Sequence, residues 1–261
     1  MKRKAILVVS FGTSHNDTRQ KTIDQIEMDI QQEYLEYAIY RAFTSKMIIN
    51  ILGSRDGIHV FTMTEAMEQM KLDGIEEVIV QPTHILNGIE NDIMIHDVNL
   101  YKEDFNVILF GAPLLNVTED YKKVIKAFVK KIPALSQNEA IVCMGHGSEH
   151  YTNASYAALD YMFKSQGYDN IYVATVEAYP SLEDIIEKLR ENKYRKIILI
   201  PFMIVAGDHA KNDMAGDEDD SWKVILESEG FEVTCVLEGL GENSDIRRIF
   251  VEHINEVLTS E

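Results

Sequence analysis

Short apolar runs alternate with longer amphipathic stretches along the whole chain. The runs are rich in β-branched residues and nearly continuous in apolarity, a pattern typical of strands buried on both faces of a parallel sheet. The stretches between them are long enough for helical crossovers. We therefore predict an α/β fold with strands at residues 5–11, 37–44, 76–85, 106–115, 140–146, 171–179, 196–205 and 231–240.

Helices are predicted between these strands. A helix is expected from about Ser14, and residues 121–132 have the clearest apolar repeat of 3.6 residues. Thr62 and Ser181 each precede an acidic residue by three positions, which is the capping-box pattern of a helix N-terminus. The final helix is expected to begin at Ser244.

The two halves of the chain share a sequence feature in addition to the same alternation of predicted strands and helices. The third predicted strand leads into Pro82–Gly88 in the first half and into Pro201–Gly207 in the second, with the same interval from proline to glycine. This repeat indicates an internal duplication. It predicts two similar βα domains with four-stranded, mainly parallel sheets flanked by helices, and an active-site cleft between them. A single continuous doubly wound sheet is the alternative.

The boundary between the two domains is expected in the short stretch 133–138, which holds a proline and polar residues. We assign residues 1–135 to an N-terminal α/β domain and residues 136–261 to a C-terminal one. The last helix, 244–258, is compatible with packing on either domain.

Composition narrows the class of protein. Of 261 residues 46% are hydrophobic, which is enough for a core and excludes general disorder. Two cysteines exclude a disulfide scaffold and a zinc ribbon. The net charge of −18 disfavours generic nucleic-acid binding and attracts divalent cations. No apolar run reaches the ~20 residues that span a bilayer, and no export-signal cleavage pattern follows the first strand, so we expect a cytoplasmic protein.

Three strand ends of the second half carry side chains that bind metals. His146 follows the first strand of that half between two glycines, Glu177 follows the second and His209 the third. Because ligands bind beyond the carboxyl ends of parallel strands, these side chains are expected to face one cleft. Two imidazoles and a carboxylate suit Co²⁺, Fe²⁺, Ni²⁺ or Zn²⁺ and leave coordination positions free. The alternative is an ordinary role for each, as a hydrogen-bonded histidine or a solvated carboxylate.

Motifs for nucleotide phosphates, dinucleotides and serine hydrolases are absent from the sequence. The segment 10–14 is a weak candidate for an anion site at a helix start. His84, at the end of the third strand, either contacts a substrate or assists proton transfer, or is simply hydrogen-bonded there. Cys143 and Cys235 lie within predicted strands and are expected to be buried small residues.

A series of motifs runs in order through the chain. They are LVVSFGTS at 7–14, RAFTSKMII at 41–49, RDGI at 55–58, HILNG at 84–88, GAPLL at 111–115, MGHG at 144–147, VEAYP at 176–180, VAGDHAKNDMAGDEDDSWK at 205–223 and GLGEN at 239–243. With these motifs the chain resembles the sirohydrochlorin cobaltochelatases of the anaerobic cobalamin pathway. The resemblance implies two similar α/β domains facing a cleft. It also implies an ATP-independent lyase whose metal-binding and catalytic residues are His146, Glu177 and His209.

The resemblance further implies Co²⁺ as the substrate metal, and sirohydrochlorin or a precorrin-2-type precursor as the macrocycle. Insertion removes two pyrrolic protons, and a neutral imidazole titrates near working pH, so we assign His146 as proton acceptor. Glu177 is expected to offset the charge of the ion and is the candidate for the second proton. The candidates for substrate binding are Ser10, Gly12, Thr13, His84, Asn87 and Gly88, with Arg41 and Lys46 as further donors to the carboxylate arms.

Two other functions stay open at this point. One is insertion of Fe²⁺ or Ni²⁺ into the same macrocycle, because a His/Glu/His site does not separate these ions. The other is a non-catalytic carrier of metal or tetrapyrrole. In either case we expect small-molecule partners and neither nucleic acid, membrane nor nucleotide, and the sequence is compatible with a homo-oligomer.

Overall fold

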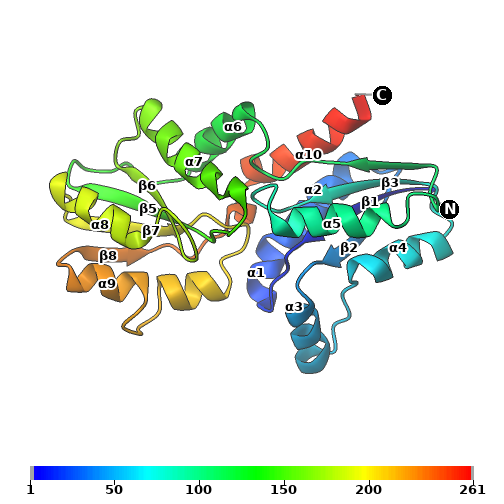
Figure 1. Ribbon diagram of the computed structural model, residues 1–261, viewed down its shortest axis with the longest axis horizontal. Helices are drawn as coiled ribbons and strands as arrows, with labels where there is room; N and C mark the ends of the chain where they lie inside the picture. The colour runs from blue at the N-terminus through cyan, green and yellow to red at the C-terminus, as the bar shows by residue number, and fades with distance from the viewer. Residues whose placement is uncertain (1–2, 260–261) are drawn as a thin grey trace. The chain divides into compact units, whose positions relative to one another are not determined.

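The computed structural model of the chain describes residues 3–259 and contains two four-stranded sheets, each parallel throughout (Figure 1). The first sheet consists of β1 (Lys4–Ser10), β2 (Ala38–Phe43), β3 (Glu77–Pro82) and β4 (Val107–Phe110). The second consists of β5 (Glu139–Gly145), β6 (Ile171–Thr175), β7 (Lys196–Pro201) and β8 (Glu232–Cys235). Each predicted strand therefore forms within the described part of the chain.

Helices connect the strands, as parallel pairing requires. They are α1 (Asn16–Lys21), α2 (Ile23–Glu33), α3 (Lys46–Ile51), α4 (Met63–Leu72), α5 (Ile89–Asn99), α6 (Thr118–Val129), α7 (Ala154–Ser165), α8 (Leu182–Glu191), α9 (Trp222–Ser228) and α10 (Ser244–Thr259). Short π-helical turns lie at η1 (Leu52–Asp56) and η3 (His209–Met214), and 3₁₀ turns at η2 (Tyr151–Asn153) and η4 (Leu240–Glu242). Both predicted capping boxes form, at Thr62 and at Ser181.

The two sheets have the same topology. Their strand orders are β2-β1-β3-β4 and β6-β5-β7-β8, so the first strand of each half lies between the second and the third. This equivalence confirms the predicted two-sheet fold and excludes one continuous doubly wound sheet. It also places the carboxyl ends of three neighbouring strands together at one edge of each sheet.

Several strands are shorter than predicted at their carboxyl ends. β4 ends at Phe110, just before Gly111-Ala-Pro, and β6 ends at Thr175, five residues before Pro180. The apolar pattern continues because the following loops are partly buried, and burial alone does not distinguish a strand from a covered loop. These loops carry the candidate site residues.

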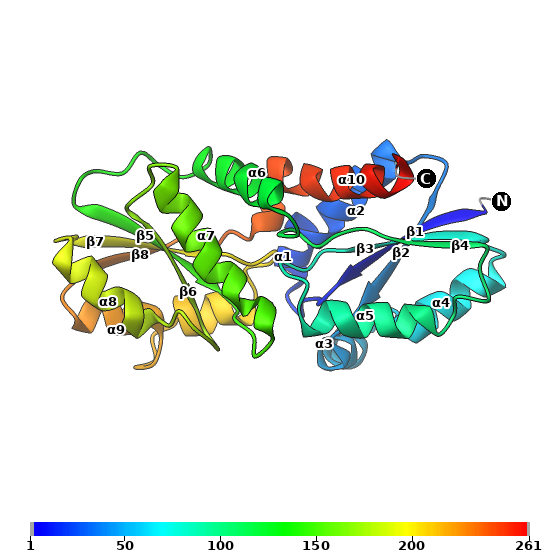
Figure 2. The ribbon, with the colours of Figure 1, turned by 45° about the horizontal axis from the view of Figure 1, so that its top comes forward.

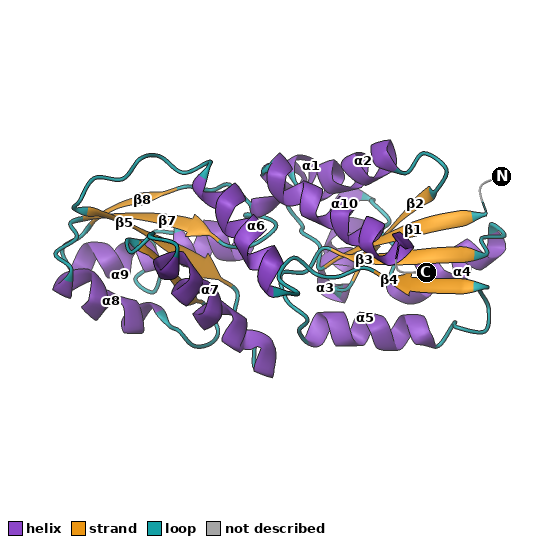
Figure 3. Cartoon of the chain, turned by 90° about the horizontal axis from the view of Figure 1, so that it is seen from above, coloured by secondary structure: helices purple, strands orange, loops and turns teal. Residues whose placement is uncertain are grey.

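The core of the first sheet has helices on both faces. On one face Ala5, Leu7 and Val9 belong to an apolar cluster with buried residues of α4 and α5. The other face is covered by α2 and by α10, which contacts α2, β3 and β4. Figures 2 and 3 show α5 and α10 on opposite sides of this sheet.

The second sheet is covered in the same way. One face packs against α8 and α9 through a cluster that includes Val142, Leu189 and Trp222. α6 and α7 meet where the ring of Phe128 lies 5.7 Å from that of Phe163. Cys143 is fully buried, and burial raises the pKa of its thiol, as expected of an inert strand residue.

The chain divides into two compact units. Unit 1 extends through Asp120 and includes the segment from Ser244 onward, and unit 2 comprises Tyr121–Asn243. The division falls inside α6, and α10 returns to the unit that holds the first sheet. The domain limits 1–135 and 136–261 stay a prediction. None of the described helices is long and apolar enough to cross a membrane.

Candidate metal centre

The backbone of unit 2 places His146 and Glu177 next to each other. His146 follows β5 directly, and its carbonyl oxygen accepts a hydrogen bond of 3.0 Å from the Glu177 backbone N–H. The loop after β6 turns back at once, because both the backbone N–H and the hydroxyl of Thr175 donate to the carbonyl of Pro180. Glu177 therefore lies on a short loop held at both ends.

The glycines beside His146 are required by close contacts. A Cβ atom on Gly145 would lie 2.4 Å from the ring of Tyr156. Gly147 has φ of +89°, and a Cβ there would lie 2.9 Å from the backbone nitrogen of Ala178. A side chain at Gly145 would displace the Tyr156 ring of α7, and one at Gly147 would displace the loop that carries Glu177. Close packing within unit 2 therefore requires both glycines.

His209 comes from a third element. It begins the π-helical turn η3, which follows β7, and its ring stands edge-on to that of His146 with the centroids 4.7 Å apart. Nδ1 of His146 lies 3.5 Å from Oε2 of Glu177. One candidate ligand atom from each of His146, Glu177 and His209 lies within 4.8 Å of the others.

This group can hold a divalent transition-metal ion. The histidines are half-buried and Glu177 is exposed, so the site is open to solvent on one side. Three protein ligands leave positions for water or for a second ligand, which a site that passes its metal on requires. Nδ1 of His146 also lies 2.9 Å from the carbonyl oxygen of Gly147. Because a carbonyl oxygen only accepts hydrogen bonds, this contact favours the tautomer that carries its proton on Nδ1 and leaves Nε2 for an ion.

The predicted substrate-binding residues lie at the carboxyl edge of the first sheet. Ser10 ends β1, and its hydroxyl accepts a 2.8 Å hydrogen bond from Thr83. Gly12 has φ of +100°, and a Cβ atom there would meet the ring of Phe43 at 2.5 Å. Thr13 is buried and its hydroxyl accepts from the backbone N–H of His15. The structure therefore shows what holds this loop in place, and its binding role stays a prediction.

The loop after β3 holds the other predicted residues. Asn87 donates to the side-chain oxygen of Asn116 at 2.9 Å and accepts from Asn91, while Gly88 is the N-cap of α5. Both ring nitrogens of His84 are buried, and this burial lowers the pKa of His84 to about 4, against the opposing effect of the Asn91 side chain. His84 is therefore a neutral imidazole near pH 7, and its role in substrate binding stays a prediction.

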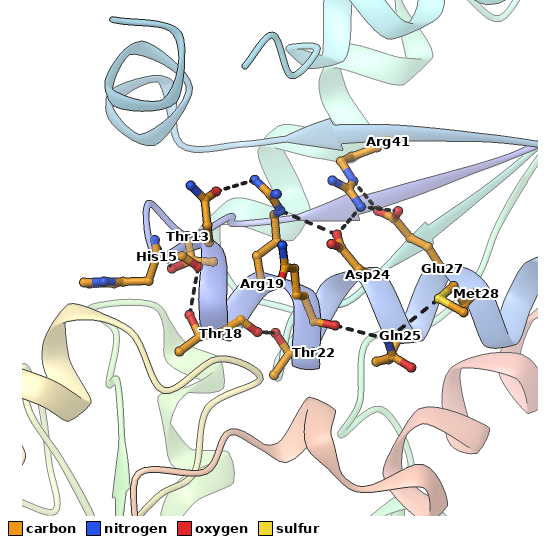
Figure 4. A network of polar contacts seen from close by, with 12 residues as sticks. Thr13, His15, Thr18, Arg19, Thr22, Asp24, Gln25, Glu27, Met28 and Arg41 are labelled. Atoms are coloured by element: carbon orange, nitrogen blue, oxygen red, sulfur yellow. Dashed lines mark hydrogen bonds and ion pairs between the residues drawn. The ribbon is translucent and has the colours of Figure 1, made fainter. Parts of the chain in front are cut away.

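Arg41, a candidate donor to substrate carboxylates, is already engaged. Figure 4 shows its guanidinium directed at two carboxylates of α2. Nε donates to Oε1 of Glu27 at 2.7 Å, and Nη2 donates to the other Glu27 oxygen and to Asp24. The Glu27 side chain is only 14% exposed, and burial raises the pKa of its carboxyl group despite the attraction of Arg41. Arg41 thus balances partly buried carboxylates.

We expect Arg41→Met to lower the free energy of unfolding by about 2 kcal/mol, because it leaves Glu27 without its charged donor and Asp24 with only the more distant Arg19. Thermal unfolding of the variant measures this loss. The double variant Arg41→Met/Glu27→Gln should recover part of it, since it removes one unpaired charge. Unchanged stability together with weakened tetrapyrrole affinity would restore the role in substrate binding.

One contact of the candidate centre was missed in the sequence. Nδ1 of His209 lies 2.5 Å from Oδ2 of Asp213, within the same π-helical turn. The spacing of four residues is visible in the sequence, but we predicted no helical turn over residues 206–215. A π-helical turn has no sequence pattern by which we could have predicted it.

The fold and the site together define a class of protein. Two α/β units of the same topology, one of which carries a two-histidine, one-carboxylate group at a sheet edge, define an α/β protein with a candidate open site for a divalent transition metal. The family model described as cobalt chelatase (CbiK) matches residues 4–259. The chain belongs to this family of cobalt chelatases, and is thus an enzyme of the metal-chelatase class.

Individual relatives agree with this assignment. A sirohydrochlorin cobaltochelatase from Salmonella typhimurium is 41% identical over 256 residues, covering 98% of this chain and 97% of the relative. The sirohydrochlorin cobaltochelatase CbiKC from Nitratidesulfovibrio vulgaris is 28% identical, covering 100% of this chain and 92% of its own. The solved structure of SirB from Bacillus subtilis with Fe³⁺ has a TM-score of 0.69 at 14% identity, covering 98% and 95% of the two chains, and supports the fold.

Proposed function

We propose that this chain inserts Co²⁺ into sirohydrochlorin, and that His146, Glu177 and His209 hold the ion before its transfer to the macrocycle. The observation that carries the assignment of the residues is their convergence from three separate strand ends of one sheet. The identity of the macrocycle rests on the two relatives that are named sirohydrochlorin cobaltochelatases.

The reaction exchanges two pyrrolic protons for one dication. As Co²⁺ leaves its protein ligands for the ring nitrogens, the imidazole of His146 regains a free lone pair that can take the first proton. Glu177, which lies 3.5 Å from His146 and is exposed, can take the second and pass it to solvent. Neither the exchange nor the proton transfer requires ATP or a redox partner.

The carboxylate arms of the substrate need donors on a chain whose net charge is −18. We propose that the carboxyl edge of the first sheet supplies them locally, through backbone N–H groups near Gly12 and Thr13 and at the N-terminus of α5, which begins after Asn87 and Gly88. His84 is neutral in this environment, so it would bind as a hydrogen-bonding group and not as a cation.

The overall charge suits the metal better than the macrocycle. A strongly acidic surface concentrates divalent cations, and screening over ~8 Å at physiological salt limits its repulsion of the substrate. We further propose that the enzyme works in the cytoplasm on Co²⁺, while Fe²⁺ or Ni²⁺ can occupy the same ligands in vitro.

Anaerobic mixing of the purified chain with sirohydrochlorin and Co²⁺ tests this function. We expect the absorption change of metal insertion to be much faster than in a protein-free control. Perturbation of the spectrum without acceleration would instead identify a carrier. Acceleration with Fe²⁺ or Ni²⁺ but not with Co²⁺ would identify a chelatase for another ion.

A further inference from the structure

The two histidines of the candidate centre have different partners. Nδ1 of His209 lies 2.5 Å from the carboxylate of Asp213, whereas Nδ1 of His146 lies 2.9 Å from the neutral carbonyl of Gly147 and 3.5 Å from the carboxylate of Glu177, itself a candidate ligand. A carboxylate behind a metal-binding imidazole fixes its tautomer and orientation and makes it a stronger ligand than a carbonyl does. The two imidazoles are therefore unequal before any metal arrives.

The local fold places Asp213 behind His209. Ala210 and Met214 are four residues apart and fully buried, so this face of η3 is fixed against the core of unit 2. His209 directly precedes Ala210, and Asp213 directly precedes Met214, so His209 and Asp213 share the neighbouring face of η3. Side chains four residues apart on a helical turn lie next to each other.

The end of the turn is held just as tightly. The backbone N–H of Gly216 donates to the carbonyl of Asn212, and a Cβ atom on Gly216 would lie 2.3 Å from that oxygen. The carbonyl of Gly216 in turn accepts a 2.8 Å hydrogen bond from the hydroxyl of Ser221, the N-cap of α9. The turn that carries Asp213 is thus anchored at both ends and holds the carboxylate at a defined position.

We propose that Asp213 is a positioning residue that makes His209 the retained ligand of the metal and leaves His146 as the ligand that releases it. The Asp213 carboxylate accepts the Nδ1–H of His209 and so directs the Nε2 lone pair at the ion. His146 has a neutral carbonyl as its nearest Nδ1 partner, and the carboxylate 3.5 Å away belongs to Glu177, itself a candidate ligand, so nothing outside the ligand set holds this imidazole on the ion as Asp213 holds His209. This division of roles rests on the proposed function of the site.

Binding of Co²⁺ alone tests the proposal without the macrocycle. Asp213→Asn should weaken Co²⁺ affinity about 10- to 100-fold and change the visible absorption of the bound ion, because no carboxylate then accepts the Nδ1–H of His209 and strengthens this imidazole as a ligand. Asp213→Glu should retain more affinity than Asp213→Asn. Asp219→Asn is the matched control, since it removes one exposed charge from the same region and should change the affinity less than twofold.

A double-mutant cycle separates positioning from simple charge. In a His209→Ala background, Asp213→Asn should have no further effect on Co²⁺ affinity, and in a His146→Ala background it should keep its full effect. Equal effects in both backgrounds, or wild-type affinity and spectrum in Asp213→Asn itself, would overturn the proposal. The Asp213 side chain is 46% exposed, so folding should survive its replacement, which circular dichroism checks.

Different results would contradict the proposed function and the positioning role of Asp213. If the wild-type chain binds Co²⁺ with the predicted dependence on Asp213 but does not accelerate insertion into sirohydrochlorin, the positioning role stands and the chelatase assignment does not. If insertion is fast while Asp213→Asn binds Co²⁺ like the wild type, the reverse holds.

Discussion

His146→Ala is expected to insert Co²⁺ into sirohydrochlorin at least about 100-fold more slowly than the wild-type chain, the usual effect of removing a positioned acid–base group. The substitution removes one of three metal ligands and the proposed proton acceptor at the same time. Glu177 lies beside the vacated position and His209 keeps its own carboxylate partner, so the variant should still bind Co²⁺ weakly. Insertion is measured anaerobically from the absorption of the macrocycle, and metal affinity separately by titration.

The matched control is His96→Ala. His96 is an exposed imidazole on α5, outside the candidate centre, and its loss should leave the insertion rate within twofold of wild type. If His146→Ala inserted Co²⁺ at the wild-type rate, the assignment of proton acceptor and metal ligand to this residue would be wrong, whatever the activity of the chain.

The pattern of apolar and polar residues was enough to predict the architecture of the two sheets. The apolar runs identify strands, and the repeated proline-to-glycine interval after the third strand of each half corresponds to the shared strand order of the two sheets. Caps such as Thr62 and Ser181 are local, because a side chain and a backbone amide three residues apart decide them. Features that depend only on residues close together in the chain can be predicted from a single sequence.

The convergence of the metal centre was also predictable, but only in part. Strand-end reasoning selects His146, Glu177 and His209, because the topology brings neighbouring strand ends together. Strand-end reasoning does not show that Asp213 contacts His209. That contact depends on a π-helical turn, which we did not predict from the sequence pattern. Sheet topology is thus enough to select the candidate ligands, whereas the carboxylate that contacts one of them depends on local backbone geometry.

For Arg41 and His84, the environment depends on residues that are distant in the sequence. Arg41 was a reasonable donor for substrate carboxylates by charge and position, yet Glu27 and Asp24 of α2 already bind its guanidinium. A single sequence does not reveal which acidic residue of a preceding helix lies opposite a strand residue. For the same reason the burial of both ring nitrogens of His84 was unforeseen.

Acid is expected to destabilise unit 1 through His84. Burial lowers the pKa of this imidazole from 6.5 to about 4. Below pH 6.5 the unfolded chain takes up a proton here that the folded chain does not take up until about pH 4, so stability is lost as the pH falls through this window and is unaffected above it. The loss from this one group between pH 6.5 and pH 5 is at most about 2 kcal/mol.

Two measurements on the wild-type chain and His84→Gln test this expectation. Nuclear magnetic resonance of the histidine ring protons should show one imidazole, absent from the variant, that stays neutral below pH 5. Hydrogen exchange of the amides of β1 and β3, which pair beside His84, should reveal that the stability of the variant falls less between pH 6.5 and pH 5 than that of the wild type. Parallel losses in the two proteins, with a ring that titrates near pH 6.5, would mean that His84 is solvated in solution. It would then be able to meet a substrate carboxylate as a cation, and its proposed role as a neutral hydrogen-bonding group would have to be given up.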